Sequence, residues 1–168
     1  FEVEIKSINL ETVQNQAFST YITSITNHQY DKQDKNGNPI RFDVKSYYDE
    51  VSGFDYSTDT NSITLEMPFN WSEQNISHTV VHEEIHFPKE FTDLLVPSYT
   101  GTLNGIDLFK SSITIDDYSI EDQRIVHFVL SQDTLRYLKQ AQKDKGIKDP
   151  QDMKFILKAD SKIVFPVI

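Results

Sequence analysis

The segment His82-Glu83-Glu84-Ile85-His86 carries the residue types best suited to metal chemistry in this chain. It matches the pattern H-E-x-x-H, in which two histidines one helical turn apart bind zinc and the adjacent glutamate activates a zinc-bound water. On a helix the segment therefore predicts a zincin-like metallopeptidase, with Glu83 as general base and a third protein ligand elsewhere. The extended metzincin pattern is missing, because Lys89 and Thr92 stand where those enzymes carry glycine and histidine.

The residues around this motif favour a strand over a helix. Thr79-Val80-Val81 is a β-branched run, and Pro88 disfavours helical angles at the residue before it. Alternate side chains of a strand share a face, so the polar face of this strand would carry four residues: His78, His82, Glu84 and His86. Glu83 would then point to the opposite, apolar face, away from both histidines of the motif.

A strand offers a different kind of metal site. Residues i and i+4 are about 13 Å apart on a strand, so His82 and His86 cannot share one ion there. The pairs His82/Glu84 and Glu84/His86 are only about 7 Å apart at the backbone. Because imidazole suits both metals, this row predicts a Cu²⁺ or Zn²⁺ site on the sheet surface. The alternative is an ordinary row of solvent-facing polar residues opposite a core face.

Two other polar features favour structural roles. His127 lies in the apolar run 125–129, which indicates a core or edge histidine rather than a ligand. The acidic segment 116–122 could hold Ca²⁺ through carboxylate oxygens, but it lacks the EF-hand spacing, so a solvated turn is favoured.

Two glycosylation sequons lie close together, at Asn70-Trp71-Ser72 and Asn75-Ile76-Ser77. Both fall in a polar segment between two predicted strands, where an exposed loop is expected. A sequon is used only in an exported protein, so the pair indicates an extracytoplasmic glycoprotein modified at Asn70 and Asn75.

The elements that would position these residues are mostly strands. Alternating or β-branched runs predict strands over 1–6, 40–45, 63–67, 98–103, 106–109, 113–115, 124–130, 153–159 and 163–167. Asn104-Gly105 predicts a type I′ hairpin turn. One amphipathic helix is expected near 132–145, capped by Ser131, and a short helical turn near 88–95. The pattern predicts a mainly β, antiparallel β-sandwich that forms a single domain over 1–168.

Composition excludes several functional classes. The chain has 168 residues and a net charge of −10, which disfavours nucleic acid as a partner because phosphate binding depends on Lys and Arg. It has no cysteine, which excludes disulfide scaffolds, thiol catalysis and Cys-ligated metals. No apolar stretch of about 18 residues is present to span a bilayer.

Four stretches of residues 45–130 resemble a known family: Met67-Pro68-Phe69-Asn70-Trp71, Val81-His82-Glu83-Glu84-Ile85-His86-Phe87-Pro88-Lys89, Tyr99-Thr100-Gly101-Thr102-Leu103-Asn104-Gly105-Ile106 and Arg124-Ile125-Val126-His127-Phe128-Val129-Leu130. They are similar to exported surface proteins of ammonia-oxidising archaea that carry a C-terminal PEFG-type (PEFG-CTERM) sorting and membrane-anchor segment. The final Phe165-Pro166-Val167-Ile168 resembles the run-in to such an anchor, which is not itself present in this chain. The resemblance implies a location outside the membrane, at the cell surface or in the pseudoperiplasm, and supplies no catalytic residues.

The leading expectation is therefore a non-enzymatic, extracytoplasmic cell-surface module, or the soluble subunit of a membrane-bound complex such as the archaeal ammonia-oxidation machinery. Its expected partners are other cell-surface or membrane-complex proteins, with membrane association through a C-terminal anchor. No cofactor is required for folding in this reading. Two alternatives stay open: a zincin-like metallopeptidase using His82, Glu83 and His86, and a periplasmic copper- or zinc-binding protein.

Overall fold

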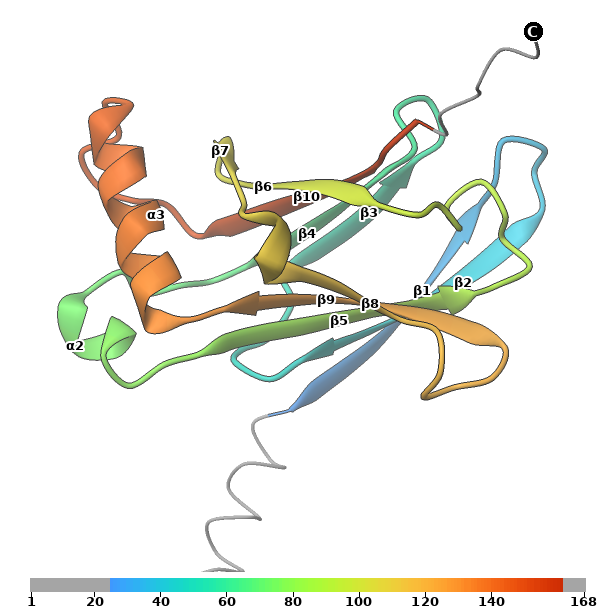
Figure 1. Cartoon of the computed structure of the whole chain (residues 1–168), viewed down its shortest axis with the longest axis horizontal. Helices are drawn as coiled ribbons and strands as arrows, with labels where there is room; N and C mark the ends of the chain where they lie inside the picture. The colour runs from blue at the N-terminus through green and yellow to red at the C-terminus, as the bar shows by residue number, and fades with distance from the viewer. Residues whose placement is uncertain (1–24, 162–168) are drawn as a thin grey trace, which may run out of the picture.

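The computed structural model describes residues 25–161, which form two five-stranded antiparallel sheets packed face to face (Figure 1). The first sheet has the strand order β1 (Thr26–Gln33), β2 (Pro39–Ser46), β5 (Val81–Pro88), β9 (Gln123–Leu130) and β8 (Ile113–Asp116). The second has the order β3 (Gly53–Ser57), β4 (Ser62–Met67), β10 (Met153–Ala159), β6 (Tyr99–Leu103) and β7 (Ile106–Asp107). The predicted antiparallel β-sandwich is confirmed.

The core lies between the two sheets and is built from alternate residues of each strand. Phe42 on β2 packs its ring 5.6 Å from that of Tyr56 on β3, and Phe128 on β9 packs 4.8 Å from Phe155 on β10. Such side chains are fully buried or nearly so, and each removes a large apolar area from water. The outer face of the first sheet is left free to carry polar residues.

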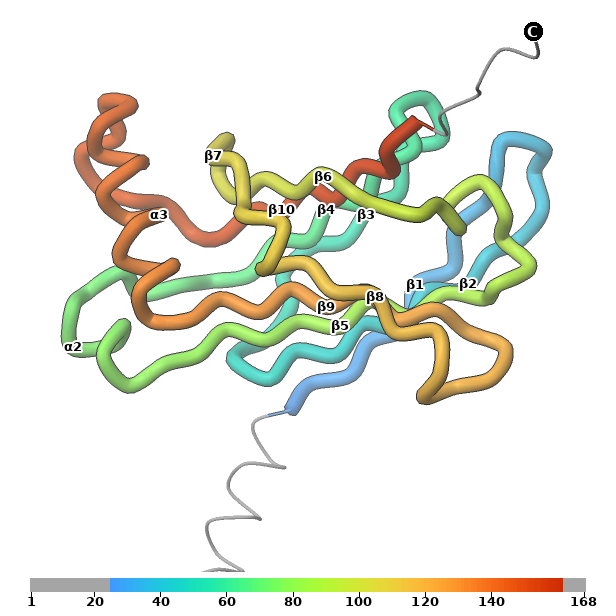
Figure 2. Tube along the Cα trace, in the orientation of Figure 1, coloured from blue at the N-terminus to red at the C-terminus, as the bar shows by residue number. Residues whose placement is uncertain are grey.

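Two helices lie at one end of the sandwich, where the tube view shows them side by side (Figure 2). The longer, α3 (Gln132–Asp144), begins at Ser131, whose side chain accepts a hydrogen bond from the backbone N–H of Thr134. Its buried Leu135 and Leu138 join the core. Gly146 follows with φ +90, as expected for the end of a helix. The predicted helix is therefore confirmed.

The second helix, α2 (Glu73–Ile76), and the 3₁₀ turn η1 (Lys110–Ser112) are short. An ion pair of 2.9 Å between Arg136 and Glu73 joins α3 to α2. None of the helices in the described part of the chain is long and apolar enough to cross a membrane.

The Asn104-Gly105 turn joins β6 to β7 as predicted, with φ angles of +49 and +81. Residues 88–95 form successive hydrogen-bonded turns, from Phe91 N–H to Pro88 O and from Leu95 N–H to Thr92 O, rather than a regular helix. Pro88 is the last residue of β5. The strands predicted at 1–6 and 163–167 lie outside the described residues.

Candidate metal centre

The H-E-x-x-H segment lies on strand β5, not on a helix. Val81, Ile85 and Phe87 are buried in the core, so the alternate residues His82, Glu84 and His86 lie on the outer face of the first sheet. The metallopeptidase alternative is wrong for this segment, because it requires two histidines one helical turn apart.

Glu83 confirms that the strand separates the two faces. Its side chain points into the core, is 0% exposed, and accepts a hydrogen bond of 2.9 Å from the Ser46 hydroxyl. Burial raises the pKa of Glu83 to about 8. The hydrogen bond from Ser46 lowers this pKa by less than burial raises it, and the charge of Asp49 raises it further. Glu83 is therefore protonated at neutral pH and cannot serve the outer histidines as a general base.

The register between β5 and β9 places His127 directly opposite Glu84. Nε2 of His82 lies 2.9 Å from Nδ1 of His127, and Nδ1 of His127 lies 3.4 Å from Oε1 of Glu84. One ligand atom from each of the three residues falls within 4.8 Å of the other two. Two strands thus bring two imidazoles and one carboxylate together at a single point.

Tyr47 packs against one side of this cluster and contacts both His82 and Glu84. Its ring stacks on His82 with centroids 4.5 Å apart and an interplanar angle of 9°, and its hydroxyl donates a 2.9 Å hydrogen bond to Oε2 of Glu84. Its backbone N–H donates to the carbonyl of His82, which holds the end of β2 against β5. Such outer partners fix the orientation of ligating side chains.

The protonation states suit metal binding. Burial would raise the pKa of Glu84, but the His86 imidazole, the Tyr47 hydroxyl and the charge of neighbouring histidines outweigh it and lower that pKa to about 2. Burial lowers the pKa of His82, and the charge of His127 adds to this effect, while Glu84 opposes it. A carboxylate and a neutral imidazole are the forms that bind a metal ion.

The distances also suit one ion. Zinc lies about 2.0–2.2 Å from nitrogen and oxygen ligands, so two ligands that subtend 90–110° at the ion are about 2.9–3.4 Å apart. The two distances of 2.9 Å and 3.4 Å that His127 makes match this range. Two histidines and one carboxylate leave further coordination positions for water, and this donor set suits Zn²⁺ or Cu²⁺.

Not every residue predicted from the sequence joins the cluster. His82 and Glu84 do, whereas Nε2 of His86 lies 3.6 Å from Oε2 of Glu84, on the other side of that carboxylate. His78 is exposed in the loop before β5 and does not share the strand face as predicted. The reason is a turn after α2, in which Thr79 N–H donates to Ile76 O, so the strand begins only at Val81.

Sequence reasoning missed His127, which it assigned to a core or edge position. Its neighbours on the outer face of β9 are Ile125 and Val129, so the run around it is apolar on both faces of the strand. Only strict alternation counted back from the buried Phe128 places His127 outward, and only the pairing with β5 places it next to Glu84.

The two sequons differ in their surroundings. Asn75 lies on α2, and its Nδ2 donates hydrogen bonds to Tyr48 (3.0 Å) and to the carbonyl of Asn70 (2.7 Å). Asn70 is exposed; its Oδ1 accepts from Ser72 N–H, and its Nδ2 has no hydrogen-bond partner within residues 25–161. Because a glycan is attached at Nδ2, Asn70 is the more available acceptor.

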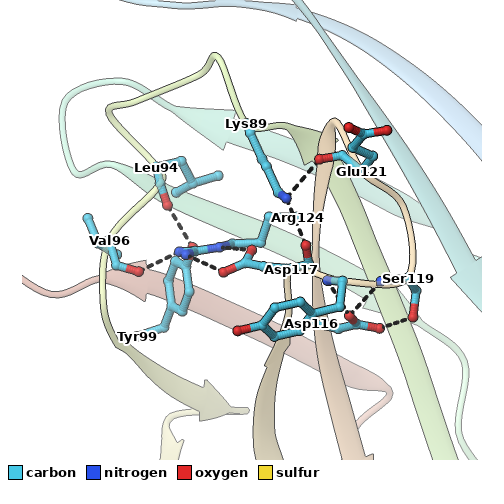
Figure 3. Close-up of polar contacts among 10 residues, drawn as sticks. Lys89, Leu94, Val96, Tyr99, Asp116, Asp117, Ser119, Glu121 and Arg124 are labelled. Carbon is cyan, nitrogen blue, oxygen red and sulfur yellow. Dashed lines mark hydrogen bonds and ion pairs between the residues drawn. The ribbon is translucent and has the colours of Figure 1, made fainter.

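The acidic segment after β8 forms a tight structural corner rather than a calcium loop (Figure 3). Asp116 accepts hydrogen bonds from the backbone N–H groups of Tyr118 and Ser119, and Asp117 pairs with Arg124 at 2.8 Å. The Lys89 ammonium donates to the carbonyls of Asp117 and Glu121. These partners engage the carboxylates of Asp116 and Asp117, whereas the other two acidic residues of the segment, Glu121 and Asp122, are exposed.

Comparison with known proteins adds no relative to this geometry: no family profile matches the chain, and no curated protein or solved structure is detectably similar. The functional argument therefore rests on the cluster itself.

Proposed function

We propose that this β-sandwich is a non-enzymatic metal-binding module that holds one divalent transition-metal ion, Zn²⁺ or Cu²⁺, through His82, Glu84 and His127. One observation carries the proposal. Three ligand atoms from β5 and β9 lie within 4.8 Å of one another, and the two separations that His127 makes, 2.9 Å and 3.4 Å, are those expected between two ligands of one ion.

The surroundings support binding without large rearrangement. Glu84 is only 9% exposed and is already ionised, and Tyr47 holds both His82 and Glu84 in place. On metal binding, the imidazole that donates the hydrogen bond between His82 and His127 would change tautomer, moving its proton to its other ring nitrogen, so that both facing nitrogens present a lone pair to the ion. The chain's net charge of −10 also favours the approach of a cation.

Binding rather than catalysis is proposed because the glutamate next to His82 faces the core. The core is formed by apolar side chains from both sheets, and His82, Glu84 and His127 are not among them. We therefore expect the protein to stay folded after dialysis against EDTA.

The test is calorimetric titration of the EDTA-treated protein with Zn²⁺ and with Cu²⁺. His82→Ala and His127→Ala should each weaken the tightest site at least tenfold, since each removes one of three protein ligands. His78→Ala, which removes an exposed histidine outside the cluster, is the matched control and should bind like the wild type. Equal affinity in wild type, His82→Ala and His127→Ala would overturn the proposal.

A second candidate function, protein contact at a cell surface, is favoured by an exposed aromatic pair. Phe109 and Tyr137 are each about half exposed, at 49% and 47%, with ring centroids 5.0 Å apart. Tyr137 lines a pocket of about 380 Å³ together with Ile106, Ala141 and four polar or charged residues, Asp107, Gln140, Asp144 and Lys145. Exposed apolar groups of this kind are typical of protein-binding sites.

This candidate keeps the expectation of an extracytoplasmic module whose partners are cell-surface or membrane-complex proteins. The coding sequence that follows the codon of Ile168 tests it. A PEFG motif, an apolar span and basic residues should follow; a stop codon at that point would contradict the proposed anchor.

A further inference from the structure

The outer face of the first sheet carries a second group of polar side chains, next to the metal site but separate from it. On β2, Asp43 and Lys45 lie on this face, on either side of the buried Val44. Their register partners on β1 are Gln29 and Asn27. These residues border one cavity of about 600 Å³. Cavities of about 300–1,000 Å³ are typical of sites that bind small organic molecules.

The two charged groups of this cavity have no partner of opposite charge. Among residues 25–161, neither Asp43 nor Lys45 makes an ion pair or a side-chain hydrogen bond, and Oδ1 of Asp43 is buried in this unpaired state. Two positions apart on one strand, the residues are about 7 Å apart at the backbone, which leaves room for a molecule between the carboxylate and the ammonium. A buried polar atom without a partner is costly, so a bound group that pairs with it would gain free energy.

His86 on β5 supplies a third unpaired group on the same side as Asp43, its register partner. The side chain of His86 is only 6% exposed, and in the described chain its Nε2 has no hydrogen-bond partner. Asp43, Glu84 and His86 do not come close enough to hold one ion, because within residues 25–161 only His82, Glu84 and His127 do so. The cavity therefore suits a molecule that is larger than an ion and carries several polar groups.

Another wall of the cavity is held in place by bonds within the protein. Ile120 and Gln123 line the cavity from the β8–β9 connection and the start of β9, and Gln123 N–H donates to Ile120 O. The Lys89 ammonium fixes the same connection through the carbonyls of Asp117 and Glu121 (Figure 3). Ile120 is 38% exposed, so this wall offers an apolar contact beside the polar side chains. A wall that is already ordered lowers the entropic cost of binding.

We propose that this cavity binds a small zwitterion, namely a free amino acid with an uncharged side chain. Its ammonium group, which has three N–H donors, supplies the hydrogen bonds that Asp43 and Nε2 of His86 lack. Its carboxylate accepts hydrogen bonds from the Lys45 ammonium, and its side chain contacts Ile120. The opposite charges of Asp43 and Lys45 favour a ligand that carries both signs over an anion or a cation alone. The inference does not rest on the proposed function, because none of these residues is a ligand of the metal site.

Calorimetric titration with neutral L-amino acids, beginning with L-valine, tests the inference. The protein is kept in EDTA, because an amino acid could otherwise bind by chelating a metal ion. At least one neutral amino acid should bind with a dissociation constant below about 0.1 mM. Asp43→Asn and Lys45→Met should each weaken this binding at least tenfold, since each removes one charged partner with little change in side-chain volume. Lys143→Met, on helix α3, is the matched control and should bind like the wild type.

Two derivatives of the bound amino acid assign each end of the ligand to its partner. The N-acetyl derivative lacks the ammonium group and the amide lacks the carboxylate, so both should bind the wild type at least tenfold more weakly than the amino acid does. Asp43→Asn should weaken the N-acetyl derivative no further, because the group that Asp43 recognises is already gone. For the same reason, Lys45→Met should weaken the amide no further.

Three outcomes would overturn the inference. One is the absence of binding by every neutral amino acid at millimolar concentration, and another is equal affinity in wild type, Asp43→Asn and Lys45→Met. The third is binding of D-glucose as tight as that of the amino acid, because an uncharged polyol needs neither charged partner. The metal-binding proposal fails separately, through titrations with Zn²⁺ and Cu²⁺ in which His127→Ala changes nothing.

Discussion

Strand β9 takes part in two polar clusters that differ in how completely their polar atoms are hydrogen-bonded. At its start, Arg124 donates to both oxygens of Asp117, at 2.8 Å and 3.0 Å, and to Val96 O and the Tyr99 hydroxyl. Every nitrogen of the guanidinium group is engaged, as Figure 3 shows. In its middle, His127 shares one hydrogen bond with His82 and faces a carboxylate at 3.4 Å.

The difference teaches how to tell a structural cluster from a binding site. The Arg124 corner has a partner for each of the three guanidinium nitrogens, and these bonds fix the β8–β9 connection to the segment before β6. In the His127 cluster the facing nitrogens of His82 and His127 share a single hydrogen bond, and on the same sheet face Nε2 of His86 and Oδ1 of Asp43 are buried without a hydrogen-bond partner among residues 25–161. Buried polar groups with incomplete hydrogen bonding are where an ion gains most.

Removal of Arg124 should have the largest effect on stability. Arg124→Met leaves Val96 O and the Tyr99 hydroxyl without their donor and Asp117 without its counter-ion, so we expect a loss of about 3 kcal/mol in the free energy of unfolding. His127→Ala, measured without metal, should cost less than about 1 kcal/mol. Urea unfolding at neutral pH checks both values, and equal losses would remove the distinction between the two clusters.

Glu83 should have the next largest effect on stability, because its buried carboxyl group stays protonated and is not paired with a cation in the described chain. Its pKa is about 8 in the folded chain and near 4.5 when unfolded, so the folded state holds a proton that the unfolded state has lost between those values. Stability should therefore fall as pH rises, by about 2 kcal/mol from pH 6 to pH 8.

Glu83→Gln should flatten this part of the pH–stability curve, since the amide does not titrate. Unfolding measured from pH 5 to pH 9 in wild type and variant provides the test. The same fall in both proteins would mean that Glu83 ionises normally inside the sandwich.

The sequence predicts much of this arrangement and misses one decisive part. Thr79-Val80-Val81 and Pro88 indicate that the H-E-x-x-H segment is a strand, and alternation then separates Glu83 from its neighbours. The position of His127 relative to the other ligands depends on which residue of β5 it faces. The pairing register between two strands about 40 residues apart cannot be predicted from the sequence of either strand alone.

Two strands also escaped prediction for physical reasons. The polar β1 (Thr26–Gln33) alternates only between partly buried and exposed residues, so it lacks an apolar face. The short β3 (Gly53–Ser57) begins with a glycine, which usually signals a turn. Both strands lie at sheet edges, where fewer side chains are buried and the alternation of apolar and polar residues is weakest.

A smaller change should test how Tyr47 supports the metal site. Tyr47→Phe removes the hydrogen bond to Glu84 but keeps the ring that stacks on His82, so we expect about tenfold weaker Zn²⁺ binding with little change in fold. Tyr137→Phe, on the far helix, is the control. Affinity equal to that of the wild type would show that Glu84 needs no support from Tyr47.

The two sequons also differ in whether the side-chain amide is hydrogen-bonded, and this difference should have the smallest effect on stability and on metal binding. Because Nδ2 of Asn75 makes two hydrogen bonds and Nδ2 of Asn70 makes none in the described chain, we expect glycan at Asn70 alone in a glycosylating host. Intact-mass spectrometry of wild type, Asn70→Gln and Asn75→Gln reads this directly. Modification at Asn75 alone would reverse the assignment.

Anomalous diffraction from crystals grown with Zn²⁺, collected at the zinc absorption edge, tests the central claim most directly. The account predicts a peak about 2.0–2.1 Å from Nε2 of His82 and from Nδ1 of His127, and about 2.0–2.2 Å from Oε1 of Glu84. A peak only at the exposed His78, or none on the outer face of the first sheet, would contradict it.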